Sequence, residues 1–94
     1  MSRYRIVVSR RYKTALKRLS RHKDFDKKTL EGAVGMLARG EKLDAKFRDH
    51  QLTGELKEYR ECHVKNDILL VYQKHDDVLM LLFIDLGSHD SLFR

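Results

Sequence analysis

The amino-acid sequence predicts an α+β fold in which a helical hairpin packs on one face of a mostly antiparallel, four-stranded sheet. Three observations support this prediction: a β-branched run near the N-terminus, two segments whose apolar residues recur at helical spacing, and three strand-like runs joined by short turns. The predicted order of elements is β-α-α-β-β-β. The chain has 94 residues, of which 41% are hydrophobic, so residues 1–94 are expected to form a single domain with one small core.

The first half of the chain predicts one strand and two helices. Residues 4–8 are rich in β-branched side chains, and Ser9 is suited to cap a helix that begins directly after them. Asp26 is a second N-cap candidate, and Gly40 is placed to end the helix that starts there. The apolar stripes that define the two helices are Tyr12, Ala15, Leu16 and Leu19 in the first and Leu30, Ala33, Val34 and Leu37 in the second.

The second half of the chain predicts the other three strands. Residues 41–56 have no sustained apolar period, so an extended, ordered loop is expected there. Strands are expected at residues 58–65, 68–74 and 78–85, and the short connections between them require antiparallel neighbours. The last of these runs is apolar on both faces, which indicates either a central strand or an interface with a partner.

Basic side chains are concentrated in the first third of the chain. The formal net charge is +6, yet residues 1–30 contain eleven Lys and Arg against two acids, and residues 31–94 contain nine against twelve. A local field of one sign favours a polyanionic partner such as nucleic acid. The alternative is a solvated helix face that binds nothing.

Segments that would direct the chain into a membrane or out of the cell are not expected. No apolar run approaches the roughly 20 residues needed to cross a bilayer, and the N-terminal apolar run is too short for a signal peptide. The single cysteine, Cys62, cannot form an internal disulfide, which favours a reducing compartment. The sequence therefore predicts a cytoplasmic protein without a membrane partner.

Three histidines and one aspartate are the candidates for acid–base chemistry. His63 lies in a predicted strand, where alternation places it on one face with Glu61 and places Cys62 on the other face, toward the predicted core. His63 therefore points away from that core, and Asp67 lies in the turn that follows it. His50 lies in the long loop, and His89 follows the last strand. Imidazoles titrate near neutral pH, so this set could move protons. The alternatives are unconnected surface histidines or a metal site, although the sequence lacks closely spaced pairs of metal ligands.

Four motifs resemble the YafQ branch of the RelE toxin superfamily. They are residues 49–54 (DHQLTG), 59–67 (YRECHVKND), 69–72 (LLVY) and 87–93 (GSH followed by LF). The similarity extends over about residues 4–93, and the order and spacing of the motifs agree with the family throughout. It implies the RelE-like fold, which has the same β-α-α-β-β-β order that the periodicity predicts.

The resemblance implies a toxin of a type II toxin–antitoxin pair, an endoribonuclease that cuts mRNA in the ribosomal A site and inhibits translation. A neutralising, DinJ-like antitoxin would be its cognate partner, and operator DNA would be bound only by the toxin–antitoxin complex. The acid–base residues of the family fall on His50, His63, Asp67 and His89. No metal or other cofactor is expected, because a ribose 2′-OH would attack the adjacent phosphate while one group takes a proton and another gives one.

The RNA-binding residues are expected at the C-terminus and on the first helix. The terminal aromatic of the family falls on Phe93, for which packing at the end of the core is the alternative. The basic side chains of the first helix are expected to face ribosomal RNA, and they include Arg10, Arg11, Lys13, Lys17 and Arg18.

Two positions depart from the family pattern. Ile68 stands where the family often has tryptophan, and Asp85 stands where it usually has arginine. That arginine would stabilise the charged phosphate in the transition state, whereas a carboxylate would repel it. One expectation is that another cation replaces it, with Lys46 and Arg48 as the candidates. The other is a catalytically weak or silent protein that acts as a ribosome- or nucleic-acid-binding module, or as an antitoxin-bound co-repressor.

Overall fold

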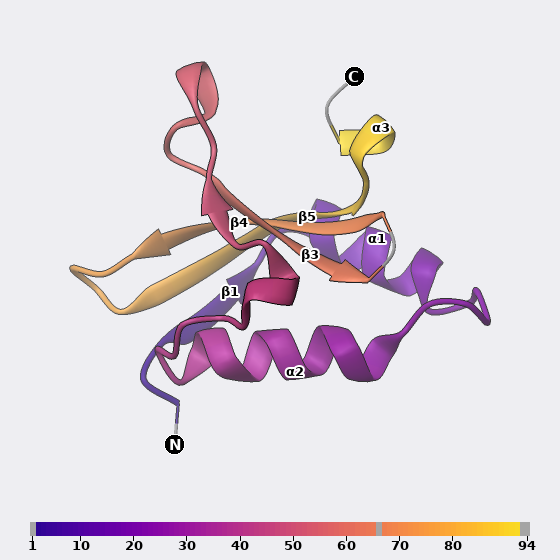
Figure 1. The fold of residues 1–94 in the computed structure, drawn as a ribbon, viewed down its shortest axis with the longest axis horizontal. Helices are drawn as coiled ribbons and strands as arrows, with labels where there is room; N and C mark the ends of the chain where they lie inside the picture. Colours follow the sequence, from indigo (N-terminus) through magenta and orange to yellow (C-terminus); the bar gives the residue numbers. More distant parts are fainter. Residues whose placement is uncertain (1, 66, 93–94) are drawn as a thin grey trace.

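The computed structural model describes residues 2–65 and 67–92 as one five-stranded sheet with helices (Figure 1). The predicted α+β class is confirmed. In chain order the elements are β1 (Arg5–Val8), α1 (Arg10–Leu19), α2 (Lys27–Ala38), the 3-10 helix η1 (Ala45–Phe47), β2 (His50–Gln51), the 3-10 helix η2 (Gly54–Leu56), β3 (Arg60–Lys65), β4 (Ile68–His75), β5 (Met80–Ser88) and α3 (His89–Leu92).

The sheet differs from the expectation in strand number. Its order is β1-β5-β4-β3-β2, with β1 parallel to β5 and the other neighbours antiparallel. The prediction of four strands was wrong, because the segment expected to be a loop contributes β2. His50 pairs with Glu61 and Gln51 pairs with Arg60. A strand of two residues is too short to produce an alternating pattern, so only its pairing with β3 reveals it.

The predicted helix ends are confirmed. The Ser9 side chain accepts a hydrogen bond from the Tyr12 amide at 3.0 Å, and the Asp26 side chain accepts one from the Thr29 amide at 3.0 Å. Gly40 follows α2 with a φ of +77°, a left-handed conformation that favours glycine. The Ser9 and Asp26 side chains bond backbone amides that the first turn of a helix leaves without a partner, so they define where α1 and α2 begin.

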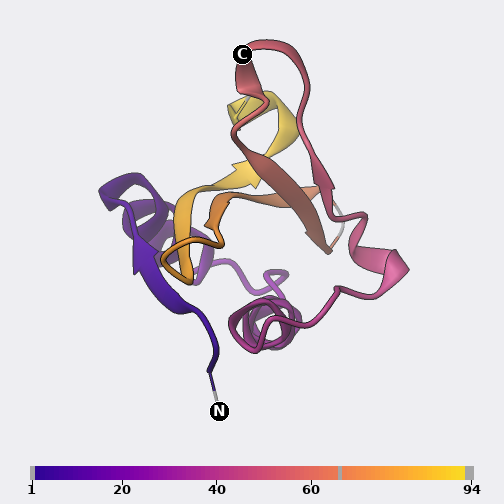
Figure 2. The ribbon, with the colours of Figure 1, turned by 90° about the vertical axis from the view of Figure 1, so that its left-hand side faces the viewer.

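Both long helices contribute to one core on the same face of the sheet (Figure 2). α1 packs mainly on β5, and α2 packs on β3. The largest fully buried side chains include Tyr72 and Phe83, whose rings meet edge to face with centroids 6.3 Å apart. The sheet face that α1 and α2 cover is called the helix face below, and the opposite one is called the open face.

The C-terminal end of the sheet extends beyond the prediction. β5 continues to Ser88, and the short helix α3 follows it directly. A Cβ atom on Gly87 would lie 2.7 Å from the Ser91 hydroxyl, so glycine allows α3 to fold back closely against β5. The Ser88 hydroxyl accepts a hydrogen bond from the Ser91 amide at 3.2 Å. This arrangement holds His89, the first residue of α3, beside the end of the sheet.

Candidate active site

A row of paired residues crosses four strands of the open face. His50 in β2 lies opposite Glu61 in β3, Glu61 opposite Val71 in β4, and Val71 opposite Asp85 in β5. His63 lies two residues beyond Glu61 on β3, and side chains two apart on a strand share a face. His50 and His63 are therefore diagonal neighbours, with backbones about 7–8 Å apart.

His50 is held between two acceptors. Its Nδ1 lies 2.7 Å from the carbonyl oxygen of Arg48, and its Nε2 lies 3.1 Å from Oε1 of Glu61. The Glu61 side chain is only 10% exposed. Both ring nitrogens thus lie within hydrogen-bonding distance of an oxygen atom, a backbone carbonyl at Nδ1 and a carboxylate at Nε2. Sequence reasoning did not single out Glu61 as a site residue, although it placed Glu61 on the same face as His63.

A second polar cluster fixes the backbone of β2 from the helix face. The Tyr72 hydroxyl donates to Asp49 Oδ1, while Arg60 donates to Asp49 Oδ2 at 3.1 Å and to the Tyr72 hydroxyl at 3.3 Å. Burial, together with the hydrogen bond to Asp49, raises the pKa of Tyr72 well above its ordinary value. Because neighbouring residues on an extended chain point to opposite sides, anchoring Asp49 on one side positions His50 on the other.

His63 and Asp67 are less constrained. His63 is half-buried and Asp67 is exposed, and within the described ranges neither side chain makes a hydrogen bond or an ion pair. Asp67 also lines a small hollow with His22 and Phe25, at the connection between α1 and α2. The structure thus places Asp67 in the turn directly before β4, close to His63 in the chain, and no hydrogen bond joins the two side chains among the described residues.

Asp85 reaches the open face because of a β-bulge in β5. Val71 pairs with Asp85, but the next residue of β4, Tyr72, pairs with Phe83, so Ile84 is the extra residue. Ile84 and Asp85 consequently line the same open-face hollow, whereas Phe83 lies in the core on the helix face. Simple alternation would have placed Asp85 beside Phe83.

The cation that contacts Asp85 is Arg11 of α1. The Arg11 Nη2 atom lies 2.9 Å from Asp85 Oδ2, while Asp85 Oδ1 accepts from the Leu86 amide at 2.8 Å. The predicted substitutes lie elsewhere: the Lys46 ammonium lies 5.2 Å from the centre of the Phe47 ring, and no contact joins Arg48 to Asp85 among the described residues. The sequence analysis listed Arg11 only among the basic side chains of the first helix. Its contact with Asp85 joins residues 74 positions apart, and no local sequence pattern indicates such a contact.

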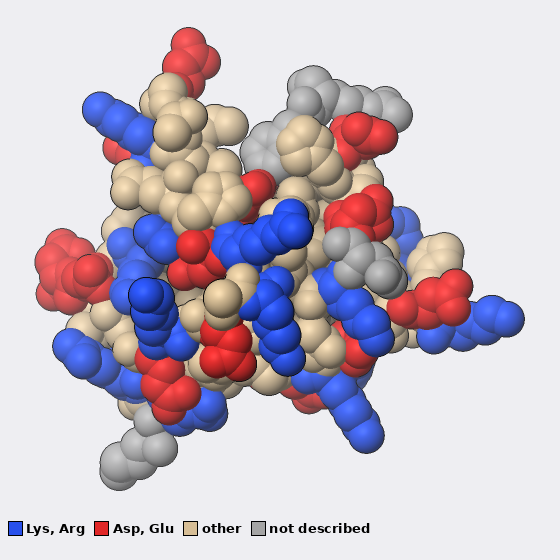
Figure 3. All heavy atoms as spheres, in the orientation of Figure 1, with Lys and Arg blue, Asp and Glu red and all other residues tan. Residues whose placement is uncertain are grey.

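The arm that carries η2 and helix α3 project side by side from the sheet (Figure 1). Leu52 and Leu56 of this arm and Leu92 of α3 line a hollow of about 430 Å³ on the open face. In the space-filling view a notch separates these two projections (Figure 3). The walls of the hollow combine apolar side chains with the ion pair between Arg11 of α1 and Asp85 of β5. They comprise Arg11, Leu52, Leu56, Tyr59, Val71, Ile84, Asp85 and Leu92. An apolar hollow with one ion pair at its rim has the chemistry of a site for a small, partly polar group.

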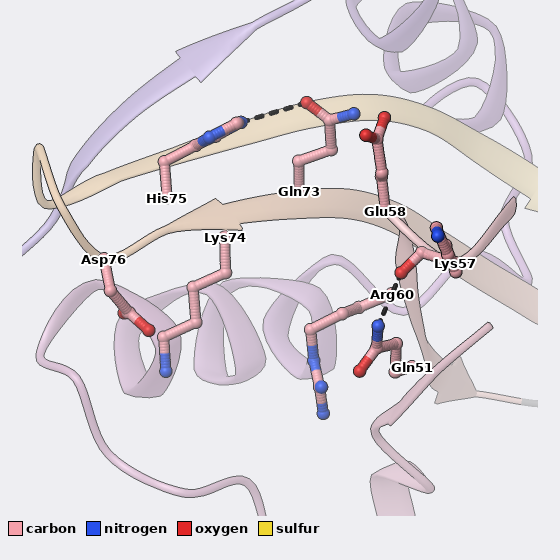
Figure 4. A pocket seen from close by; sticks show the side chains of 8 residues that line it. All are labelled: Gln51, Lys57, Glu58, Arg60, Gln73, Lys74, His75 and Asp76. Carbon is pink, nitrogen blue, oxygen red and sulfur yellow. Dashed lines mark hydrogen bonds between the residues drawn. The ribbon is translucent and has the colours of Figure 1, made fainter. Parts of the chain in front are cut away.

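Another hollow, of about 600 Å³, lies away from the predicted catalytic residues (Figure 4). It is lined by the β4–β5 hairpin end and by the segment before β3, and His75 within it bonds Gln73 at 3.0 Å. Figure 4 shows Gln73 and His75 on one side of β4 and Lys74 on the other, so the hollow curves around the strand. None of His50, His63, Asp67 and His89 lines it.

The remaining predictions concern the terminus, metals and the cysteine. Phe93 lies outside the described residues. Within residues 2–65 and 67–92, no three His, Cys, Asp or Glu side chains gather as metal ligands do, and no helix is long and apolar enough to span a membrane. Cys62 is fully buried, and burial raises the pKa of its thiol to about 12, so its role is packing rather than nucleophilic chemistry.

Comparison with known proteins identifies the family of this chain. The family model described as "Bacterial toxin of type II toxin-antitoxin system, YafQ" matches residues 4–94. The chain is 38% identical over 74 residues to the mRNA interferase toxin YafQ of Escherichia coli K12. The aligned region covers 78% of this chain and 76% of the relative.

Solved structures agree over nearly the whole chain. The toxin in the E. coli DinJ–YafQ toxin–antitoxin complex superposes with a TM-score of 0.86 at 30% identity, covering 98% of this chain and 99% of that one. A metal-bound toxin from Helicobacter pylori superposes with a TM-score of 0.86 at 43% identity, covering 96% and 99%. This chain therefore belongs to the YafQ family of bacterial type II toxins, whose E. coli members are mRNA interferases, that is, endoribonucleases.

Proposed function

We propose that this protein is a ribosome-dependent, metal-independent mRNA endoribonuclease that cuts mRNA in the ribosomal A site and thereby arrests translation in the cytoplasm. The observation that carries the proposal is the open face, where His50 and His63 are diagonal neighbours. The same face has a hollow with the Arg11 guanidinium in its wall, although none of the predicted catalytic residues lines that hollow. A DinJ-like antitoxin would neutralise the toxin, and operator DNA would be bound only by their complex. The names of the relatives support an RNA substrate.

The reaction needs two proton transfers. The ribose 2′-oxygen bonds to the adjacent phosphorus as its proton passes to a base, and the bond between phosphorus and the 5′-oxygen breaks as an acid protonates that oxygen. The products are a 2′,3′-cyclic phosphate and a 5′-hydroxyl. Each transfer contributes about 10²–10⁴-fold to the rate. Since the chemistry uses the 2′-OH, DNA would not be cut.

The geometry favours His63 as the base. Both nitrogens of His50 face acceptors, whereas His63 has no hydrogen-bond partner within the described ranges and can take a proton. His50, held by Glu61, would carry positive charge toward the phosphate. His89, at the start of α3, would be the acid, and Asp67 would orient an imidazole or share the role of base. Phe93 would stack on a base of the mRNA.

Primer extension on mRNA from a translating extract tests this proposal. The wild type is expected to produce new 5′ ends within codons, and His63→Ala and His89→Ala are each expected to reduce them by about 10²-fold or more. His75→Gln is the matched control, because His75 lies in the same sheet but in the other hollow. Absence of new ends with the wild type, or full cleavage by both variants, would refute the proposal.

A second candidate function, a catalytically silent ribosome- or nucleic-acid-binding module or co-repressor, is favoured by Asp85. Its carboxylate lies on the open face, where a phosphate would bind, although Arg11 neutralises it. Under this alternative the wild type neither cleaves mRNA nor arrests growth, and Asp85→Arg creates cleavage. Growth arrest by the unmodified chain, relieved when the antitoxin is produced with it, would exclude the silent module.

A further inference from the structure

Arginine side chains gather in a cleft between α1 and α3. The cleft measures about 390 Å³, and its walls comprise Arg10, Arg11, Thr14, Ala15, Arg18, Asp85, Leu86, Ser91 and Leu92. Three guanidinium groups face one carboxylate, so the cleft carries a formal charge of +2. That carboxylate already pairs with Arg11 at 2.9 Å, which leaves the groups of Arg10 and Arg18 uncompensated within the cleft.

Helical geometry explains why these three residues converge. At 100° per residue, positions 10, 11 and 18 fall within an arc of about 100° on α1, and Thr14 lies between them. The lysines of the same helix, Lys13 and Lys17, do not line the cleft. The basic residues of α1 are therefore not one uniform surface, since only the arginines meet α3.

The cleft adjoins the open-face hollow. Arg11, Asp85 and Leu92 belong to the walls of both, so the two cavities are neighbours that share one partition. A chain molecule that places an apolar ring in the hollow can place its next charged group in the cleft. Single-stranded RNA has this alternation of bases and phosphates, and arginine binds phosphate oxygens with two parallel hydrogen bonds.

We propose that the cleft between α1 and α3 binds a phosphate of the substrate RNA next to the one that is cut. The proposal rests on the proposed function, since it assumes that RNA occupies the hollow of the open face. It assigns Arg10 and Arg18 to substrate binding, and Arg11, held by Asp85, to the junction between the two cavities. It gives the arginines of α1 a contact with mRNA rather than with ribosomal RNA.

Binding to RNA that cannot be cut tests the proposal apart from catalysis. The probe is a fluorescent single-stranded hexanucleotide of mixed sequence with 2′-O-methyl riboses, and anisotropy gives its affinity at several salt concentrations. Arg10→Ala combined with Arg18→Ala is expected to weaken binding about tenfold or more. It should also reduce the slope of log affinity against log salt by about 0.7, since the contact with one phosphate is lost.

A matched control removes the same charge elsewhere. Lys27 and Lys28 are exposed on α2, away from both cavities, so Lys27→Ala combined with Lys28→Ala should change affinity by no more than about twofold. Equal losses in the two double variants, or in Lys13→Ala with Lys17→Ala, would mean that the field is diffuse and would overturn the proposal. Failure of the wild type to bind the probe at low salt would also overturn it.

NMR signals of the arginine side chains locate the bound phosphate. Addition of the probe should shift the Nε–H signals of Arg10, Arg11 and Arg18 more than that of Arg39, which pairs with Glu41 on another surface. Equal shifts with a hexaglutamate peptide would identify a site for acidic protein segments and overturn the proposal. Binding in the cleft without cleavage in the extract would refute the proposed function alone, whereas cleavage without cleft binding would refute only this inference.

Discussion

The two faces of the sheet use the same strands for different purposes. On the helix face, Tyr72 and Phe83 are fully buried, and in the polar cluster around Asp49 the carboxylate is paired with Arg60. On the open face, His63 keeps unsatisfied hydrogen-bonding capacity within the described ranges. The difference indicates that packing on one face maintains the fold, which leaves the other free to hold reactive groups. Substitutions on the two faces should therefore have different consequences.

Adjacent residues in β5 provide the largest expected contrast. Phe83→Ala empties a site in contact with Tyr12 and Tyr72, so the free energy of unfolding should fall by about 3–5 kcal/mol. Ile84→Ala, on the open face, should cost about 2 kcal/mol or less, because Ile84 is only half-buried. Urea denaturation followed by circular dichroism measures both. Equal losses would mean that the open face contributes to the core as the helix face does.

Substitution of Glu61, on the open face, should reduce activity with little change in stability. Glu61→Gln retains the shape of the side chain but removes the charge opposite His50, so cleavage of mRNA should fall by about tenfold to hundredfold. The urea midpoint should change little, and Glu41→Gln, which loses an exposed pair with Arg39, should leave cleavage intact. Unchanged cleavage by Glu61→Gln would show that the ion pair with His50 has no part in catalysis.

Alkaline pH should lower the free energy of unfolding through Cys62, a buried residue of the helix face. Burial raises the pKa of Cys62 to about 12 in the folded protein, while the thiol ionises near 9 when unfolded. The folded state therefore holds a proton that the unfolded state releases, and stability should decline as pH rises from about 9 to about 12. In Cys62→Ala the decline should be shallower, as measured by urea denaturation at several pH values. An unchanged slope would contradict the assignment to Cys62.

The smallest effect is expected at the edge of the core, where Asp26 caps α2. A hydrogen bond from Lys65 at 2.9 Å, with another from the Thr29 amide, lowers the pKa of Asp26 below its ordinary value. A lowered pKa contributes stability above the pKa of the unfolded state, and that stability is lost as pH falls below about 4. Asp26→Asn keeps the cap, so only the acid-dependent part should disappear from acid-unfolding curves. The change should be small, because solvent screens both exposed groups.

Local chemistry in the sequence accounted for much of the fold. Ser9, Asp26 and Gly40 marked the helix ends, and the apolar stripes placed α1 and α2 where the structure has them. Each of these signals depends on residues at most a few positions apart, which is the range over which a helix makes its own hydrogen bonds. The fully buried Cys62 likewise agrees with its predicted core-facing position.

For the site, the sequence supplied candidates but not their arrangement. It placed His63 and Glu61 on one face by alternation. Residue type and position suggested His50, His63, Asp67 and His89 for acid–base chemistry, and the family resemblance implied the same four. The partner of His50, however, became visible only through the pairing of β2 with β3. The catalytic roles of these residues stay predictions until the cleavage experiments are done.

Alternation, length and capping determined from the sequence alone that this chain forms β1, α1, α2, β3, β4 and β5 in that order, with a basic first helix. Tertiary structure alone decided that β1 lies parallel to β5, that a bulge at Ile84 turns Asp85 to the open face, and that Arg11 meets it there. The physical reason is that pairing between segments more than 70 residues apart depends on the packing of the whole core. No neighbouring residue in the chain encodes it.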